Sequence, residues 1–250
     1  MPTRILGSIL VLLLAFPAAA APLRVVVDQG HGGEKEGAIG PCGTKEKDLA
    51  LAISLRLAEA LRLRGHEVIL TRDRDVSLGL APRIQLANER AADVFVSIHA
   101  NSVAAAKDRV HGVETYFLSA DATDSHAQAL ANQENADDEA AATAVDPLDF
   151  ILADLARMEA HVGSSRLAVA IHENLVRRTG ARDRGVRQAP FFVLSGAHMP
   201  AVLVEVGYVS HPAEERRLAS RDNQEAIAQA IAEGIDAFGR RVMATASPER

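Results

Sequence analysis

The chain has 250 residues, of which 48% are hydrophobic and 24% are charged, proportions that are ordinary for a soluble globular protein. The formal net charge is −6 and no long block of Lys or Arg occurs, which argues against a nucleic-acid partner. The length favours one domain. Cys42 is the only cysteine, so an internal disulfide is excluded and stability must come from the core and from any bound metal.

The first 21 residues differ from the rest of the chain. Arg4 precedes the apolar run ILGSILVLLLAF, and four alanines follow Pro17. This order is typical of a secretory signal peptide, which we expect over 1–21 with cleavage near Ala20. The alternative is a membrane anchor, but the apolar run is shorter than the ~20 residues of a comfortable span. No later segment is long and apolar enough to cross a bilayer, so we expect an exported chain.

After this segment, apolar runs alternate with amphipathic ones. We predict strands at 24–27, 67–71, 93–100, 113–119, 190–194 and 200–210. We predict helices at 47–64, 81–92, 164–179 and 224–241, with Gly65 and Gly180 ending two of them. This alternation predicts an α/β layered domain with a mostly parallel sheet, whose ligands bind beyond the carboxyl ends of the strands.

An acidic segment interrupts this pattern. Between Arg109 and Arg157 the chain has no Lys or Arg but has ten Asp and Glu residues. Its centre, ANQENADDEAAATAVDP, is rich in alanine and acid. The simplest interpretation is a solvated helical excursion from the domain.

Four residues at strand ends or helix starts carry the chemistry. His31 follows the first strand within VVVDQGHGGEKEGAIG, and His99 ends the third strand. Glu46 opens the helix after the glycine loop, where it could simply complement the helix dipole. Either histidine could be an ordinary hydrogen-bonded residue. Glu205 lies inside the apolar strand VLVEVGY, where a carboxylate needs a partner, a metal or a proton.

Together these four residues fit a zinc hydrolase. Such a site takes three protein ligands and leaves a fourth position for water, so two His and one Glu would suffice. The remaining Glu would then accept a proton from that water. The glycines around His31 would let its backbone approach the metal and substrate closely.

Competing motifs are absent from the sequence. It contains no HExxH, no GxxxxGK[ST] and no GxSxG, and Lys35 stands where GxGxxG needs its third glycine. No signature around Cys42 indicates a nucleophile. The other histidines are interpreted as surface or structural residues: His66, His111, His126, His161, His172, His198 and His211.

At this point the sequence resembles a known family. The blocks VVVDQGHGGEKEGAIG, EKDLALAISLRLAEAL, VILTRDRD, LAPRIQLANERAADVFVSIHANS, GVETYFLS and PAVLVEVGYVSHPAEERRL occur in one order. They are similar to the zinc-dependent N-acetylmuramoyl-L-alanine amidases of bacterial cell walls, of the type used in daughter-cell separation. The resemblance covers roughly residues 24–239. Six blocks in the same order make it specific for this family.

The resemblance implies one Zn²⁺ per chain with His31, Glu46 and His99 as ligands, and Glu205 as the catalytic glutamate. It implies a peptidoglycan substrate, cleaved at the amide between N-acetylmuramic acid and L-alanine. It also implies an α/β layered single domain with a mixed, mostly parallel sheet of about six strands flanked by helices. The family commonly has Pro at the position of Gln29, a change that leaves every ligand in place.

The expected organisation is a signal peptide at 1–21, a catalytic domain at 22–240 and a disordered tail at 241–250. No added wall-binding domain is apparent in the sequence. Similar amidases of Gram-negative bacteria carry an inserted helix that covers the active site until an activator protein moves it. The segment at about 120–160 resembles such an insert, which implies a periplasmic, autoinhibited enzyme, and we hypothesise that Glu134 reaches the zinc.

Two other functions remain open at this stage. The first is a catalytically inactive module that uses the cleft to bind peptidoglycan, although the complete set of four residues speaks against it. The second is a zinc peptidase that cuts within the stem peptide. Its metal chemistry would be identical, so only its products would distinguish it.

Overall fold

A six-stranded sheet forms the centre of the fold. The computed structural model describes residues 22–136 and 158–246. The strands of the sheet are β1 (Arg24–Gln29), β2 (Glu67–Leu70), β3 (Val94–Asn101), β4 (Val113–Leu118), β5 (Asp183–Ala189) and β6 (Ala201–Tyr208). They lie in the order β2-β1-β3-β6-β4-β5. β4 pairs antiparallel with β6, and every other neighbouring pair is parallel. The mixed, mostly parallel sheet confirms the predicted fold class.

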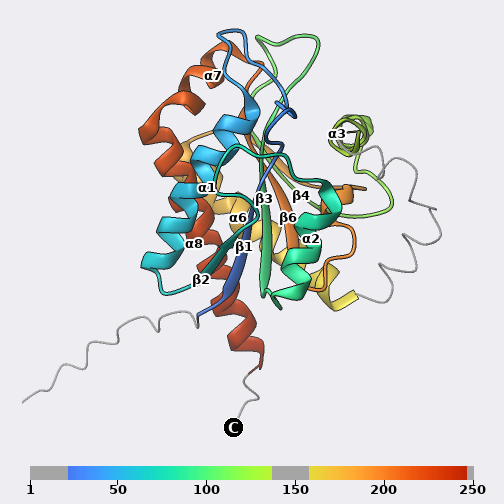
Figure 1. Ribbon diagram of the computed structural model, residues 1–250, viewed down its shortest axis with the longest axis vertical. Helices are drawn as coiled ribbons and strands as arrows, with labels where there is room; N and C mark the ends of the chain where they lie inside the picture. Colours follow the sequence, from blue (N-terminus) through green and yellow to red (C-terminus); the bar gives the residue numbers. More distant parts are fainter. Residues whose placement is uncertain (1–21, 137–157, 247–250) are drawn as a thin grey trace, which may run out of the picture.

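Helices cover both faces of this sheet (Figure 1). They are α1 (Glu46–Leu63), α2 (Leu80–Glu89), α3 (Ser125–Asn135), α6 (Met158–Thr179), α7 (Pro212–Ala219) and α8 (Arg221–Ala246), with a short 3₁₀ helix η1 (Phe192–Leu194). As predicted, α1 and α6 end at Gly65 and Gly180, which have φ of 87° and 62°, a conformation that suits glycine.

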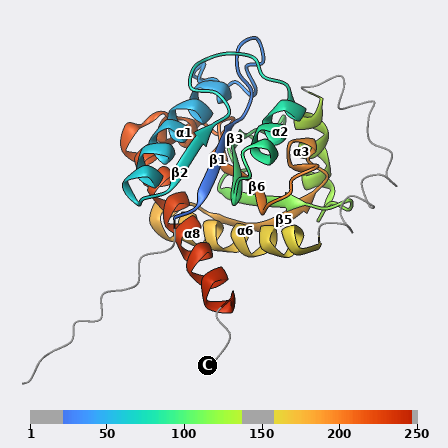
Figure 2. The ribbon, with the colours of Figure 1, turned by 60° about the horizontal axis from the view of Figure 1, so that its bottom comes forward.

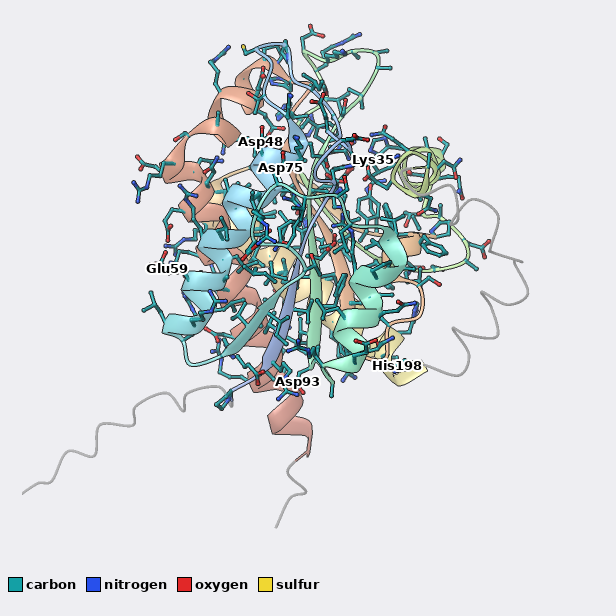
Figure 3. All side chains as sticks on the ribbon, viewed as in Figure 1. Lys35, Asp48, Glu59, Asp75, Asp93 and His198 are labelled. Atoms are coloured by element: carbon teal, nitrogen blue, oxygen red, sulfur yellow. The ribbon has the colours of Figure 1, made fainter. Side chains whose placement is uncertain are left out.

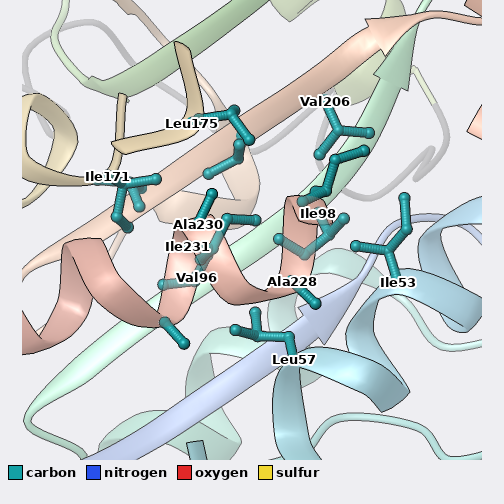
Figure 4. Close-up of a cluster of buried hydrophobic side chains, with 14 of the residues drawn as sticks. Ile53, Leu57, Val96, Ile98, Ile171, Leu175, Val206, Ala228, Ala230 and Ile231 are labelled. Carbon is teal, nitrogen blue, oxygen red and sulfur yellow. The ribbon is translucent and has the colours of Figure 1, made fainter. Parts of the chain in front are cut away.

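The face covered by α1, α6 and α8 holds the larger core. Figure 2 shows α6 and α8 side by side beneath the sheet. Figure 4 shows how aliphatic side chains of these helices meet those of β3 and β6. The labelled members are Ile53, Leu57, Val96, Ile98, Ile171, Leu175, Val206, Ala228, Ala230 and Ile231. Burial of these apolar side chains supplies the main driving force for folding.

The opposite face is covered by α2, α3 and the η1 segment. Its core is smaller and includes Phe95 of β3, Tyr116 of β4 and Leu203 of β6. Because side chains alternate between the two faces of a strand, His99 and Glu205 lie on this same face, further along their strands. The candidate site therefore lies beyond the smaller core, at the carboxyl ends of β3 and β6.

The structure corrects two of the predicted elements. The apolar run 190–194 was predicted as a strand, but the strand there is β5, which precedes the run, and residues 192–194 form η1. The sequence of β5, DRGVRQA, has charges at positions where an apolar pattern was sought. The tail predicted to be disordered from 241 is instead helical through Ala246.

Several predictions fall outside the described residues. These are the signal peptide at 1–21, the 137–157 part of the acidic insert and the last residues, 247–250. In the described remainder, no helix has the length and apolarity that a membrane span requires. His198, labelled in the lower part of Figure 3, is exposed, which agrees with its interpretation as a surface residue.

Candidate metal centre

Two histidines and two glutamates meet in one buried cluster. His31, Glu46, His99 and Glu134 each offer a ligand atom, and these atoms all lie within 4.8 Å of one another. Oε1 of Glu46 lies 3.1 Å from Nε2 of His31 and 3.0 Å from Nδ1 of His99. Oε2 of Glu134 lies 3.3 Å and 3.1 Å from the same two nitrogens. The geometry brings together the three residues predicted as ligands and adds the hypothesised Glu134.

The glycine loop makes room for these side chains. His31 itself has φ of 56°, a left-handed conformation that side chains other than glycine rarely adopt and that stores strain. A Cβ atom at Gly30 would lie 2.6 Å from the His99 ring. One at Gly37 would lie 2.6 Å from the His31 ring and 2.7 Å from Oε2 of Glu46. The loop is rich in glycine because its backbone packs directly against the cluster.

Two buried arginines hold the backbone of this loop. Arg83 donates to the carbonyl oxygen of His31 at 2.9 Å and forms an ion pair with the fully buried Asp28 at 2.9 Å. Arg72 donates to the carbonyl oxygen of Gly30 at 2.9 Å. Burial raises the pKa of the Asp28 carboxyl, but Arg83 and hydroxyl donors outweigh burial and hold that pKa below its usual value. The charged pair thus anchors the strained loop from α2.

The carboxylate of Glu46 is oriented by two backbone donors. The amide of Ala100 donates to Oε1 at 3.0 Å, and the amide of Ala38 donates to Oε2 at 2.9 Å. Glu46 lies in the first turn of α1, where the helix dipole also favours a negative charge. These contacts fix the carboxylate between the ends of the glycine loop and β3.

The electrostatics of the cluster favour a bound cation. Burial raises the pKa of Glu46, but the neighbouring His31 and His99 outweigh it and hold that pKa below its usual range. Burial lowers the pKa of His99, but the carboxylates of Glu134 and Glu46 raise it to about 10. Two buried carboxylates that face two imidazoles therefore attract positive charge, which a proton or a metal ion can supply.

Glu205 lies beside the cluster with no partner of its own. It is opposite His99 in the β3–β6 register and is 1% exposed. Among the described residues, neither of its carboxylate oxygens has a hydrogen-bond partner. Burial raises its pKa well above the usual value, and the charges of Glu46, Glu134 and Glu114 raise it further. The charge of His99 opposes this rise, and a buried carboxyl with a raised pKa suits a group that accepts and donates a proton.

A second polar group, which was not predicted from the sequence, lies next to Glu205. Glu114 of β4 lies opposite Glu205 in the antiparallel register and is completely buried. It accepts hydrogen bonds from Arg184 at 2.9 Å, Asn101 at 2.9 Å and the hydroxyl of Tyr208 at 3.0 Å. Burial raises its pKa, but His126 and Arg184 outweigh burial and lower it to about 2. A Glu within the strand VETYFL was the available signal, of the same kind as Glu205 in VLVEVGY.

Helix α3 lies over both the candidate metal site and the polar group around Glu114. Asp124 caps its first turn by accepting from the amide of Ala127 at 2.9 Å, and it also forms an ion pair with Arg187 of β5. His126 lies 3.0 Å from the Tyr208 hydroxyl, so it is more than a surface residue. At the other end of α3, Asn135 donates to the carbonyl oxygen of Pro190.

Two of the remaining histidines are structural. His66 lies 2.8 Å from Asp236 and accepts from the amide of Leu23. His172 lies 2.8 Å from Asp183, on the side of the sheet covered by α6. Both are buried between elements that they connect, as the sequence analysis predicted for histidines outside the cluster.

Comparison with known proteins identifies the family of this chain. A family model described as N-acetylmuramoyl-L-alanine amidase matches residues 25–237. The amidase AmiA of Escherichia coli is 35% identical over 219 residues, which are 86% of this chain and 75% of that protein. AmiC of Neisseria meningitidis is also 35% identical, and the chain spans 52% of its length.

A solved structure extends the comparison to the fold. AmiC2 of Nostoc punctiforme superimposes with a TM-score of 0.68 at 33% identity, and the match covers 89% of this chain and 99% of AmiC2. The matched family segment, 25–237, contains the glycine loop, the whole cluster and Glu205. The chain therefore belongs to the N-acetylmuramoyl-L-alanine amidase family.

Proposed function

We propose that this chain is a zinc-dependent hydrolase that cleaves the amide between N-acetylmuramic acid and L-alanine in peptidoglycan. One observation carries the proposal: three well-oriented ligand side chains lie beside a buried glutamate that has no hydrogen-bond partner among the described residues. Family membership supports the substrate and the bond.

The donor set fits one zinc ion. Two imidazole nitrogens and one carboxylate, from His31, His99 and Glu46, are the ligand types that catalytic zinc takes, and all three are buried and held by neighbouring groups. A zinc ion bound there would polarise the amide carbonyl and lower the pKa of a water molecule to ~7.

Glu205 would carry the proton in this reaction. Its raised pKa and its position beside His99 suit a base that accepts a proton from the attacking water. The same carboxyl then donates the proton to the amine of L-alanine as that amine leaves. Among the described residues, no other side chain is hydrogen-bonded to the oxygens of Glu205.

We further propose that α3 holds the enzyme in a resting state. The carboxylate of Glu134 lies 3.3 Å from the His31 nitrogen, where it would take the position that a zinc hydrolase leaves open for water. An activator protein that displaces α3 would free this position. Export to the periplasm through the segment 1–21, and a role in daughter-cell separation, complete the proposal on the strength of the family resemblance.

Product analysis tests the activity. Purified sacculi are incubated with the exported chain and zinc, and the released material is identified by mass spectrometry. We expect intact stem peptides that begin with a free L-alanine amine. Shortened stems would instead establish a peptidase, and binding without release by an α3-loosened variant would establish a binding module.

The proposed inhibition by α3 is tested in the same assay with Glu134→Gln. This substitution removes the carboxylate and keeps the shape of the side chain. We expect a basal rate about tenfold or more above that of the unchanged chain. Gln128→Glu, on the same helix but away from the cluster, serves as the control. An unchanged or lower rate in a folded Glu134→Gln protein would remove this inhibition from the proposal.

A further inference from the structure

A pair of arginines lies at the far end of the polar row that contains Glu205. Across the sheet, His99 of β3 is opposite Glu205 of β6, and Glu205 is opposite Glu114 of β4. Beyond β4, the strand β5 contributes Arg184 and Arg187, which both reach Glu114. The row of polar residues therefore runs from the candidate metal site, at His99, to the two arginines of β5. It follows the surface that α3 covers.

The two arginines are held by groups that do not belong to α3. Arg184 donates to Glu114 at 2.9 Å, and its guanidinium lies 5.2 Å from the centre of the Tyr208 ring. Arg187 lies 3.4 Å from the same Glu114 oxygen through Nε and donates to the carbonyl oxygen of Arg184. These contacts to Glu114 are made by the Nε atom of each arginine. They would keep both arginines in place if α3 moved away.

Another nitrogen of the Arg187 guanidinium contacts the N-terminal end of α3. Nη1 of Arg187 forms an ion pair with Asp124, the residue that caps the helix. With Asp124 present, the two arginine charges face two carboxylates, Asp124 and Glu114. Without it, the two guanidinium groups share one buried carboxylate, that of Glu114. A partly buried positive charge without a counterion is unfavourable, so the opened site calls for an anion.

Helix α3 thus places one carboxylate at each end of the covered row. Asp124 forms an ion pair with Arg187, and Glu134 lies with His31, Glu46 and His99 in the candidate metal site. They are ten positions apart, and a helix rises 1.5 Å per residue, so the two carboxylates lie about 15 Å apart along the axis. An extended peptide covers the same distance in about four residues.

We propose that Arg187, supported by Arg184, binds a carboxylate of the stem peptide about four residues from the cleaved amide. In the resting state, Asp124 occupies this subsite, just as Glu134 occupies a position in the candidate metal site. Guanidinium groups recognise carboxylates through paired N–H donors, and Nη1 of Arg187 is the donor that becomes available. The inference rests on the proposed function, since it places the cleaved bond at the cluster.

Synthetic substrates test the subsite in a background that weakens α3. The double variant Asp124→Asn/Glu134→Gln removes both carboxylates, and Asn still caps the helix. N-acetylmuramoyl tetrapeptides are compared as the free acid, as the C-terminal amide and with the side-chain carboxylate of residue 3 amidated. Amidation of the recognised carboxylate should raise KM by about 10- to 100-fold, the usual loss for a charged hydrogen bond. The other amide identifies which of the two carboxylates is bound.

Arg187→Gln in this background should remove the preference. We expect KM for the free acid to rise to the value for the disfavoured amide, with kcat nearly unchanged and partial recovery in Arg187→Lys. Arg182→Gln removes an exposed charge just before β5 and should leave the preference intact. An equal loss on all three substrates, or a preference that survives in Arg187→Gln, would overturn the subsite.

Binding of the free tetrapeptide acid and amide, measured by calorimetry on the same variants, separates this inference from the proposed function. Hydrolysis at the expected bond without an Arg187-dependent preference removes the subsite and keeps the amidase. An Arg187-dependent preference in binding, with no hydrolysis of any substrate, removes the amidase and keeps the carboxylate site.

Discussion

The two faces of the sheet are built differently. The face under α1, α6 and α8 is packed with Leu, Ile and Val, and it forms a continuous core (Figure 4). The face under α2 and α3 has a smaller core and then a row of charged groups from His99 to Arg187. One face supplies the stable frame, and the other carries the groups that can do chemistry.

The helices differ in the same way. The core-facing side of α6 presents Leu167, Ile171 and Leu175, which are all fully buried. Of the buried residues of α3, only Leu130 is a large apolar side chain, and the others are two alanines and Glu134. Burial of a Leu or Ile side chain contributes roughly 1.5–3 kcal/mol. Helix α3 is therefore held largely by its polar ends, which suits an element that is displaced in the proposed activation.

Removal of a ligand should have the largest effect on the polar face. His99→Ala should abolish both zinc binding and turnover, because it leaves His31 as the only imidazole in the cluster of candidate ligands. Metal content after dialysis, measured by atomic emission, and release of stem peptides are the two readouts. His198→Ala, at an exposed site, is the control. Stoichiometric zinc in His99→Ala would contradict the assignment of this ligand.

Glu205→Gln should separate chemistry from metal binding. The substitution keeps the shape of the side chain but removes its capacity to accept a proton, so kcat should fall by roughly 10²–10⁴-fold. Zinc content should remain near one per chain, because the carboxylate of Glu205 is hydrogen-bonded to none of the candidate ligands in the described part of the chain. Hydrolysis at a near-normal rate would remove Glu205 from the mechanism.

A pair of leucine substitutions compares the two faces directly. Leu57→Ala, in the larger core, should lower the free energy of unfolding by about 2–5 kcal/mol, the usual cost of a cavity in a packed core. Leu130→Ala should cost less and should raise the basal hydrolysis rate, since it loosens α3. Urea unfolding and the sacculus assay measure both variants. Equal destabilisation, with no gain of activity in Leu130→Ala, would break the comparison.

The polar face should also be the pH-sensitive one. The pKa of Glu114 is about 2 in the folded chain against an ordinary 4.5, so its stabilising contribution is present above pH 4.5 and is lost as the pH falls towards 2. About 1.4 kcal/mol of it should be lost by pH 3.5. Urea unfolding at pH 6.5 and 3.5 should therefore reveal a smaller pH effect in Glu114→Gln. A parallel loss in both proteins would assign the effect to other groups.

Sequence patterns predicted the parts of this molecule that depend on local signals. Five of the six strands and the principal helices follow from apolar periodicity, and Gly65 and Gly180 mark two helix ends. His31, Glu46 and His99 were found because each lies where a strand ends or a helix begins. The strand β5 escaped because its residues are mostly polar and it lies at the edge of the sheet, where one side needs no apolar partner.

By itself, the sequence determined the layered α/β frame and the residue types available at the carboxyl ends of its strands. Only the tertiary structure decided that Glu134 reaches the cluster, that Glu114 faces Glu205 and that Asp124 lies on Arg187. These contacts join β4, β5, β6 and α3 across long stretches of chain. The physical reason is that periodicity encodes which face of an element is buried, whereas a charge reveals its partner only after packing has brought the two elements together.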